Sequence, residues 1–219
     1  MLNLTTQASK GHNIQNIIFD FGGVICDIDF KISEQKFREL GFRGYNPSYS
    51  VSDSQDVFRQ FEGGELSIPE FISRLKKHLN EGATDEQVKK AWNSMILQLR
   101  ANRISLIEEV RKSYRIFILS NSNELHYYKY LKDLTTNFGY NSFEDLFEKT
   151  WFSFRIHLQK PSREIFEYVL RDGSLNPAET LFIDDSIQHI EAAGNSGIRT
   201  YHLQPPEDIT MLFKHSSLS

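Results

Sequence analysis

Short apolar runs alternate with helical segments through the second half of the chain, and this alternation restricts the fold more than any other feature. The runs RIFILS (115–120) and TLFID (180–184) are each followed by a few polar residues and then a segment with helical periodicity. A similar run, NIIFD (16–20), lies near the N-terminus. This order is typical of parallel βαβ units. We therefore predict an α/β fold with an open, doubly wound parallel sheet.

Residues 30–99 interrupt this pattern with a series of helix signals. Gly41 ends one helical segment, and Pro69 lies in the first turn of another, where its missing N–H does no harm. Thr84 and Gln87 have the spacing of a capping box. We predict a compact insertion of about four helices, the last running to Leu99. The core domain would then comprise residues 14–29 and 100–219, and residues 30–99 would form a helical cap.

The composition describes a soluble globular protein. A net charge of −4 gives no electrostatic reason to expect nucleic acid or an anionic membrane as partner. The single cysteine, Cys26, excludes an internal disulfide and is expected to be a packed side chain. Residues 1–13 are polar and lack the apolar stretch of a secretory signal. We predict a cytoplasmic enzyme, and the sequence does not give its oligomeric state.

Polar residues follow the predicted strands at the points where ligands bind in open α/β sheets, beyond the carboxyl ends of the strands. Taken singly, each has a structural explanation, such as a helix cap or a surface lysine. Together they place carboxylates, a hydroxyl group and an ammonium group at one edge of the sheet. These residues are Asp20, Ser120 with Asn121, Lys160, and Asp184 with Asp185.

This combination indicates a site for a metal ion and a phosphoryl group. Three carboxylates at one edge would repel each other without a cation, and oxygen ligands favour a hard divalent ion, for which Mg²⁺ fits best. The lysine and the hydroxyl group can neutralise and hydrogen-bond an anion that carries several oxygens. We therefore expect a phosphorylated small molecule as substrate and Mg²⁺ as cofactor.

Four motifs in this order resemble those of the haloacid dehalogenase superfamily: FDFGGVI, ILSNSN, QKPSREIF and FIDDS. The resemblance covers residues 15–205, and the helical insertion matches the cap of that superfamily, whose core is Rossmann-like. Within it the chain is most similar to bacterial sugar-phosphate phosphatases of the glucose-1-phosphatase-like branch. That branch shares the DID that follows the first motif and the SNxNxxH pattern found here at 120–126.

The resemblance implies a nucleophile and a set of metal ligands. Asp20 would attack phosphorus and form an aspartyl-phosphate, which divides a difficult displacement into two steps. Its second carboxylate oxygen, the backbone carbonyl of Gly22 and Asp185 would bind Mg²⁺ directly. Asp184 would be an outer-shell ligand, which interacts with the metal ion without binding it directly.

The resemblance also implies the groups that hold the substrate. Ser120, the backbone of Asn121 and Lys160 would bind the phosphoryl oxygens, with Lys160 stabilising charge in the transition state. His126, the last residue of the SNxNxxH pattern, would contribute to substrate binding.

Gly22 departs from the family pattern, because most phosphatases of this superfamily have an aspartate there that protonates the leaving group. Such general acid catalysis is worth about 10²–10⁴ in rate. Its loss predicts a substrate with a good leaving group, such as a sugar 1-phosphate. The candidates for activating water are Asp27, Asp29, His126 and Asp184, although Asp27 and Asp29 fit turn or cap positions equally well.

Two other functions fit parts of this pattern. Metal-independent 2-haloacid dehalogenases also lack the acid at the Gly22 position, but the acid pair at 184–185 counts against that activity. A non-catalytic binder of phosphorylated ligands is the other alternative, and a mutase is disfavoured because it usually keeps the second acid. His157 is expected to be a loop residue and His189 a structural one.

Overall fold

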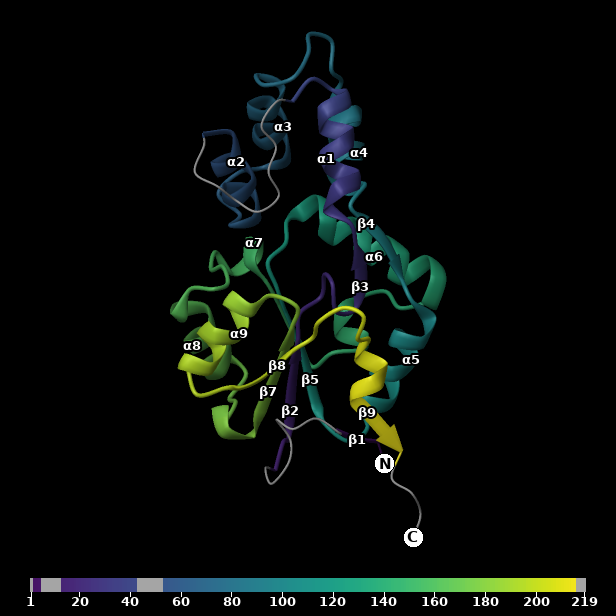
Figure 1. Cartoon of the computed structure of the whole chain (residues 1–219), viewed down its shortest axis with the longest axis vertical. Coiled ribbons are helices and arrows are strands. Elements are labelled where there is room, and N and C mark those ends of the chain that lie inside the picture. The colour runs from purple at the N-terminus through teal and green to yellow at the C-terminus, as the bar shows by residue number, and fades with distance from the viewer. Residues whose placement is uncertain (1, 5–12, 43–52, 216–219) are drawn as a thin grey trace.

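A five-stranded parallel sheet forms the centre of the molecule, in a computed structural model that describes residues 2–4, 13–42 and 53–215. The strand order is β6-β5-β2-β7-β8, and all four pairings are parallel. The predicted doubly wound α/β fold is thus confirmed (Figure 1). The strands are β2 (Asn16–Phe19), β5 (Arg115–Ser120), β6 (Lys149–Phe152), β7 (Thr180–Asp184) and β8 (Arg199–His202).

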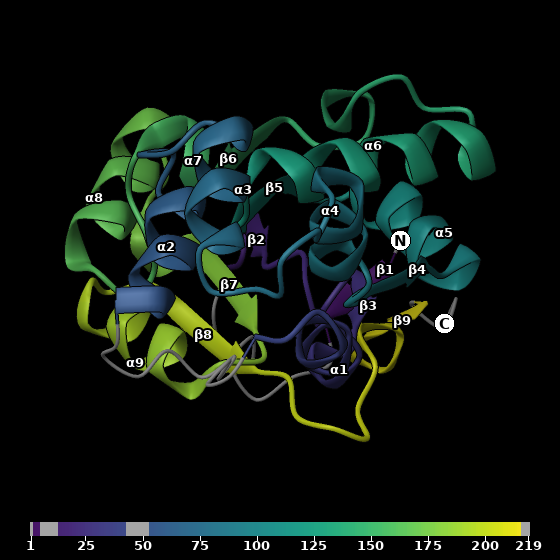
Figure 2. The ribbon, with the colours of Figure 1, turned by 90° about the horizontal axis from the view of Figure 1, so that it is seen from above.

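Helices cover both faces of this sheet (Figure 2). Side chains alternate along each strand, so that Ile18 and Phe182 join one apolar cluster while Ile17 and Ile183 join another. The first cluster packs against α8 and α9, and the second against α5 and α6. These helices and the short α7 are α5 (Ala101–Val110), α6 (Glu124–Phe138), α7 (Ser153–Ile156), α8 (Arg163–Asp172) and α9 (Ile187–Asn195).

In the described part of the insertion, four helices lie between β3 and β4, at the end of the molecule opposite strands β1 and β9 (Figure 1). The predicted capping box of Thr84 and Gln87 is present, and a second one joins Ser67 and Glu70. Residues 43–52 of the predicted cap and most of the polar segment 1–13 lie outside the described residues. The helices are α1 (Phe30–Glu39), α2 (Asp53–Glu62), α3 (Ile68–Lys76) and α4 (Asp85–Asn93).

The end of the insertion differs from the prediction. Helix α4 stops at Asn93, and residues Ile96–Leu99 form strand β4 instead of continuing the helix. Strand β4 pairs antiparallel with β3 (Cys26–Ile28), so the chain enters and leaves the insertion through a two-stranded ribbon. The predicted helical end was wrong because this pairing with a distant segment overrides local propensity.

Smaller elements complete the fold. Strands β1 (Leu2–Leu4) and β9 (Phe213–His215) form a separate antiparallel pair, which was not predicted from the sequence. None of the helices in the described part of the chain has the length and hydropathy needed to cross a membrane. The 3₁₀ helices are η2 (Phe143–Asp145), η3 (Pro177–Glu179) and η4 (Ile209–Leu212).

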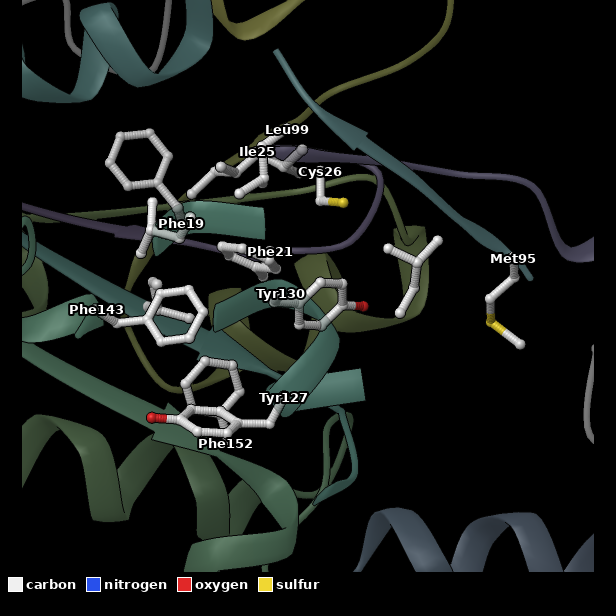
Figure 3. Close-up of a cluster of buried hydrophobic side chains, with 14 of the residues drawn as sticks. Phe19, Phe21, Ile25, Cys26, Met95, Leu99, Tyr127, Tyr130, Phe143 and Phe152 are labelled. Atoms are coloured by element: carbon white, nitrogen blue, oxygen red, sulfur yellow. The ribbon is translucent and has the colours of Figure 1, made fainter. Parts of the chain in front are cut away.

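A buried aromatic cluster fixes the segment that follows β2 (Figure 3). The ring of Phe21 meets Tyr130 edge to face at 4.7 Å and Phe143 at 5.3 Å between centroids. Such pairs contribute about 0.5–1.5 kcal/mol beyond burial alone. Cys26 belongs to the same cluster, and burial raises the pKa of its thiol to about 12, in accord with the expected packed side chain. The packing of Phe21 immobilises the backbone next to Asp20.

Candidate functional site

Three neighbouring strands bring the predicted site residues to one edge of the sheet. Asp20 directly follows β2, while Ser120 and Asp184 are the last residues of the flanking strands β5 and β7. The backbone N–H of Asp20 donates to the carbonyl of Ile183 at 2.9 Å, which continues the parallel ladder. Carboxylate oxygens of Asp20, Asp184 and Asp185 lie within 4.8 Å of one another. The sequence prediction that these acids cluster agrees with this geometry.

Lys160 is the cation at the centre of this cluster. Its side chain is fully buried, and its ammonium group donates to Asp20 Oδ1 at 2.9 Å, to Asp184 Oδ2 at 2.7 Å and to the carbonyl of Leu119 at 2.9 Å. An ammonium group has three donors, so these contacts use all of them. Lys160 therefore occupies one fixed position between the two carboxylates.

The charges of the cluster are strongly coupled. Burial raises the pKa of Asp20 to about 7; Lys160 opposes this shift, whereas Asp184 and Asp185 add to it. Burial also disfavours ionised Asp184, but Lys160 and His189 outweigh that effect and lower its pKa. The pKa of Lys160 is raised, because the two carboxylates outweigh the burial of the ammonium group. Asp184 and Lys160 therefore form a charged pair, while Asp20 lacks sufficient positive charge around it.

The side-chain amide of Asn121 fixes the backbone of Lys160 at both polar groups. Its Nδ2 donates to the Lys160 carbonyl at 2.8 Å, and its Oδ1 accepts from the Lys160 N–H at 2.9 Å. This role of the Asn121 side chain was not predicted, because the resemblance implies only its backbone at the site. The hydroxyl of the preceding Ser120 is buried and has one long contact, 3.5 Å to the carbonyl of Asn121.

A tight glycine turn follows Asp20. Gly23 has φ = +78°, and a Cβ atom there would lie 2.2 Å from Asp185 Oδ2, so both the conformation and the close approach of Asp185 require glycine. Gly22 does not have a left-handed conformation, and a Cβ there would lie 2.4 Å from Cδ1 of Ile28. The flexible side chain of Ile28 thus fills the space beside Gly22.

The two acids of the FIDDS motif have different surroundings. Asp184 is fully buried and accepts from Lys160, from the backbone N–H of Ser186 at 2.8 Å and from Nδ1 of His189 at 3.0 Å. Asp185 is exposed, and its carboxylate lies against the glycine turn. Although the residue is exposed, the surrounding protein partly desolvates its carboxylate, and this desolvation together with the charge of Asp184 raises the pKa of Asp185. His189, expected to be structural, proves to be a direct partner of Asp184.

Asp27 and Asp29 make structural contacts. Asp27 pairs with Arg100 at 2.5 Å and with the buried Arg103 at 3.0 Å, and Arg103 also binds Asp208 at 2.8 Å. Asp29 is the N-cap of α1, where its side chain accepts from the backbone of Lys31. These contacts fit the turn and cap positions predicted for the pair, and the activation of water by either residue stays a prediction.

His126 is packed between the core and the insertion. Its ring stacks on Trp92 with centroids 4.7 Å apart, Nδ1 lies 3.1 Å from Asn123 Nδ2, and Nε2 lies 3.4 Å from the carbonyl of Trp92. Because the amide of Asn123 is a donor, the imidazole proton belongs on Nε2. The contacts of His126 do not include the acid cluster, so its assignment to substrate binding stays a prediction.

The burial of His126 predicts a pH dependence of stability. Burial lowers its pKa from 6.5 to about 3, so between these values the unfolded chain binds a proton that the folded chain does not. The free energy of unfolding should therefore fall as the pH is lowered below 6.5, by up to about 1.4 kcal/mol per pH unit from this residue. Urea unfolding between pH 4.5 and 6.5 should show a shallower slope for His126→Gln. Equal slopes for the two proteins would contradict the buried neutral imidazole.

The acid cluster fits a hard divalent cation. When all three are ionised, Asp20, Asp184 and Asp185 carry three negative charges against the one positive charge of Lys160, which leaves two uncompensated. The ligand atoms that these three side chains offer to a metal ion are carboxylate oxygens, which Mg²⁺ prefers. Desolvation raises the pKa values of Asp20 and Asp185, and repulsion from Asp184 adds to both shifts, so positive charge beside these carboxylates would favour their ionised forms. The carbonyl of Gly22 as a further ligand stays a prediction.

Sequence comparisons with known proteins find phosphatases among the relatives of this chain. The chain is 31% identical over 188 residues to a D-ribitol-5-phosphate phosphatase of Bacteroides thetaiotaomicron, covering 86% of this chain and 91% of that protein. It is 23% identical to a sesquiterpene phosphatase of Aspergillus oryzae, over 85% and 88% of the two chains. These names do not specifically support the glucose-1-phosphatase-like branch.

Solved structures of a haloacid dehalogenase family enzyme from B. thetaiotaomicron match the fold. Its magnesium complex is 30% identical, with a TM-score of 0.83, over 91% of this chain and 98% of that one. A mutant of the same enzyme with magnesium and inorganic phosphate matches with the same TM-score of 0.83. These complexes support the predicted Mg²⁺ cofactor. The family model of haloacid dehalogenase-like hydrolases matches residues 17–203, and the chain belongs to this family.

Proposed function

We propose that this protein is a Mg²⁺-dependent phosphatase of small phosphorylated sugars or sugar alcohols. The observation that carries the proposal is the buried Lys160 between Asp20 and Asp184, with Asp185 beside them. The site thus combines a fixed ammonium group with three carboxylates whose charge it neutralises only in part. Such a site can bind a phosphoryl group together with a metal ion.

Asp20 is the proposed nucleophile. One of its carboxylate oxygens attacks phosphorus, and the bond from phosphorus to the ester oxygen breaks. The ester oxygen leaves as an alkoxide that takes a proton from solvent water, and an aspartyl-phosphate is formed. Lys160 faces Asp20 and stabilises the charge that develops on the phosphoryl oxygens. The hydroxyl of Ser120, which has only one long contact, can turn to donate to the same oxygens.

In the second half of the reaction, water attacks the aspartyl-phosphate, regenerates the Asp20 carboxylate and releases inorganic phosphate. Mg²⁺ held by Asp20 and Asp185 would supply positive charge next to the phosphoryl oxygens. Asp184, fixed by Lys160 and His189, holds the ammonium group in place during both steps. The described helices of the insertion, α1 to α4, would act as a cap and contact the organic part of the substrate.

Two observations bear on the leaving group. Gly22 stands where most relatives in the superfamily have the acid that protonates the ester oxygen. A substrate whose alcohol is more acidic, such as a sugar 1-phosphate, depends less on that acid. The relative named as a D-ribitol-5-phosphate phosphatase acts, by that name, on a phosphate ester of a primary alcohol. The alkoxide released from such an ester is a poor leaving group. We therefore extend the proposed substrates from sugar 1-phosphates to pentose and pentitol 5-phosphates.

A substrate panel tests the function. Purified protein is assayed for phosphate release from sugar 1-phosphates, sugar 6-phosphates, pentitol 5-phosphates and an aryl phosphate, with Mg²⁺ and with EDTA. The proposal expects turnover of at least one sugar or sugar-alcohol phosphate, and its loss with EDTA. Halide release from 2-haloacids in EDTA, with no phosphate release, would establish the dehalogenase alternative. Binding of phosphate esters without turnover would establish a non-catalytic binder.

The two acids of the FIDDS motif should respond differently to substitution. Asp185→Asn should raise the Mg²⁺ concentration for half-maximal activity at least about ten-fold, because a metal loses a direct charged ligand. Asp184→Asn should instead lower stability, because the buried Lys160 loses its 2.7 Å partner. Mg²⁺ titrations and urea unfolding of both variants separate the roles. A larger shift in Mg²⁺ requirement for Asp184→Asn would reverse the proposed order.

A further inference from the structure

Backbone carbonyl groups at the C-terminal end of α2 contact side chains of the core. The amide groups of Gly64 and Glu65 close the helix locally by donating to the carbonyls of Phe61 and Gln60. Other carbonyls at this helix end each face a polar side chain that lies about 90–100 residues further along the chain. The pairs are Arg59 O with Gln159 Nε2 (3.1 Å), Glu62 O with Ser153 Oγ (2.6 Å) and Gly63 O with His157 Nδ1 (3.0 Å).

Glycine makes this close approach possible. Gly64 has φ = +73°, and a Cβ atom there would lie 2.1 Å from the carbonyl oxygen of Phe154 in α7. A larger residue would separate α2 from α7 and stretch the three contacts. His157 also has a positive φ, 55°, which places its ring beside the helix end.

Ser153 contacts both the C-terminal end of α2 and the loop 120–123, which carries the proposed phosphate ligands. Its hydroxyl is fully buried and accepts from the backbone N–H of Ser122 at 2.9 Å. The same hydroxyl lies 2.6 Å from Glu62 O and 3.0 Å from Ser122 O. A hydroxyl has only one proton, so it can donate to one of these two carbonyls at a time. The shorter distance assigns the proton to Glu62 when α2 is docked, and withdrawal of α2 would return it to Ser122.

Ser122 belongs to the loop that carries the proposed phosphate ligands. It follows Ser120 and Asn121 directly, and the Asn121 side chain holds both backbone polar groups of Lys160. A change in the hydrogen bonds of Ser122 is therefore transmitted over two residues to the groups that face the phosphoryl oxygens.

We propose that Ser153 is a positioning residue that couples the docking of α2 to the geometry of the loop 120–123. This inference rests on the proposed phosphatase function for its catalytic consequence, because that function gives the loop its role. With α2 docked, Ser153 binds the loop through the N–H of Ser122 alone. With α2 withdrawn, it binds the loop at both the N–H and the carbonyl of Ser122, and the loop takes a second arrangement.

A double-mutant cycle tests the coupling. His157→Gly removes one docking contact without touching the loop, and its glycine accepts the positive φ. It should lower kcat about three- to ten-fold, with a smaller change in KM, the scale of one hydrogen bond. In a Ser153→Ala background the same substitution should change kcat less than about two-fold, because the connection to the loop is already broken.

Hydrogen exchange gives a readout that does not need turnover. The amides of residues 120–123 should exchange at different rates in His157→Gly and in the wild type, because the hydrogen bonds of Ser153 to Ser122 change, and the Ser153→Ala background should abolish that difference. His157→Asn, which keeps a donor and tolerates a positive φ, should restore wild-type exchange and kcat. Ser113→Ala, at an exposed serine after α5, controls for loss of a hydroxyl.

The outcomes separate the two proposals. Independent, multiplicative effects of the His157 and Ser153 substitutions on exchange would overturn the coupling, whatever the activity. Absence of turnover in the wild type would overturn the phosphatase while the exchange cycle still decides the coupling. Ser153→Cys, a weaker donor of similar shape, is measured beside Ser153→Ala, so that the result does not depend on one variant folding.

Discussion

Asp20→Asn is expected to lower phosphatase turnover by at least about a thousand-fold while the protein stays folded. Removal of the nucleophile from a covalent mechanism has effects of this size or larger. The amide has nearly the shape of the carboxylate, and the buried Lys160 keeps Asp184 as its ionic partner at 2.7 Å. Burial raises the pKa of Asp20 to about 7, so replacement by a neutral group should even relieve repulsion from Asp184 and Asp185.

The test combines kinetics with unfolding. Phosphate release is measured on the best substrate of the panel, and urea unfolding shows whether the variant is as stable as the wild type or more stable. Asp29→Asn is the matched control, because Asp29 caps α1 and asparagine caps helices equally well. Turnover of Asp20→Asn above a few per cent of wild type would remove Asp20 from the role of nucleophile.

The sequence predicts the central sheet because local and global signals agree there. The three central strands, β2, β5 and β7, are short apolar runs, and parallel strands buried on both faces require such runs. Helix ends were equally readable where side chains cap them, as at Thr84 and Gln87. Strand β4 was not readable, because its pairing with β3 connects segments about 70 residues apart and the local sequence continues a helical pattern.

The sequence predicts which acidic residues gather at the candidate site, but it does not predict most of the hydrogen bonds that these residues make. Strand ends in a parallel sheet share an edge, so the proximity of Asp20 and Asp184 follows from the alternation alone. The clamp of Asn121 on Lys160, the contact of His189 with Asp184 and the hydroxyl of Ser153 depend on how loops return to that edge. The order SNxNxxH suggested a substrate contact for His126, but sequence order does not show that α6 packs this ring against Trp92.

Lys160→Met is expected to cost about 3–5 kcal/mol of stability at neutral pH, in addition to a loss of activity of about 10²-fold or more. Methionine fits the length of the lysine stem, so packing changes little. The substitution leaves Asp184, which is fully buried, without the ammonium group that lowers its pKa. Lys149→Met is the matched control, because Lys149 and Asp172 form an exposed pair whose loss should cost less than about 1 kcal/mol.

The size of this effect should depend on the charge of the cluster in three ways. Lowering the pH should reduce the stability difference from wild type, because protonation of Asp184 removes the unpaired negative charge. Mg²⁺ should reduce the difference as well, because it adds positive charge beside the same carboxylates.

The double variant Lys160→Met/Asp184→Asn should recover most of the lost stability and none of the activity, because the charge is removed but the group that faces the phosphoryl oxygens is still absent. Urea unfolding with and without Mg²⁺ measures all three, and a double variant as unstable as Lys160→Met would show that Lys160 stabilises the fold by packing and not by charge.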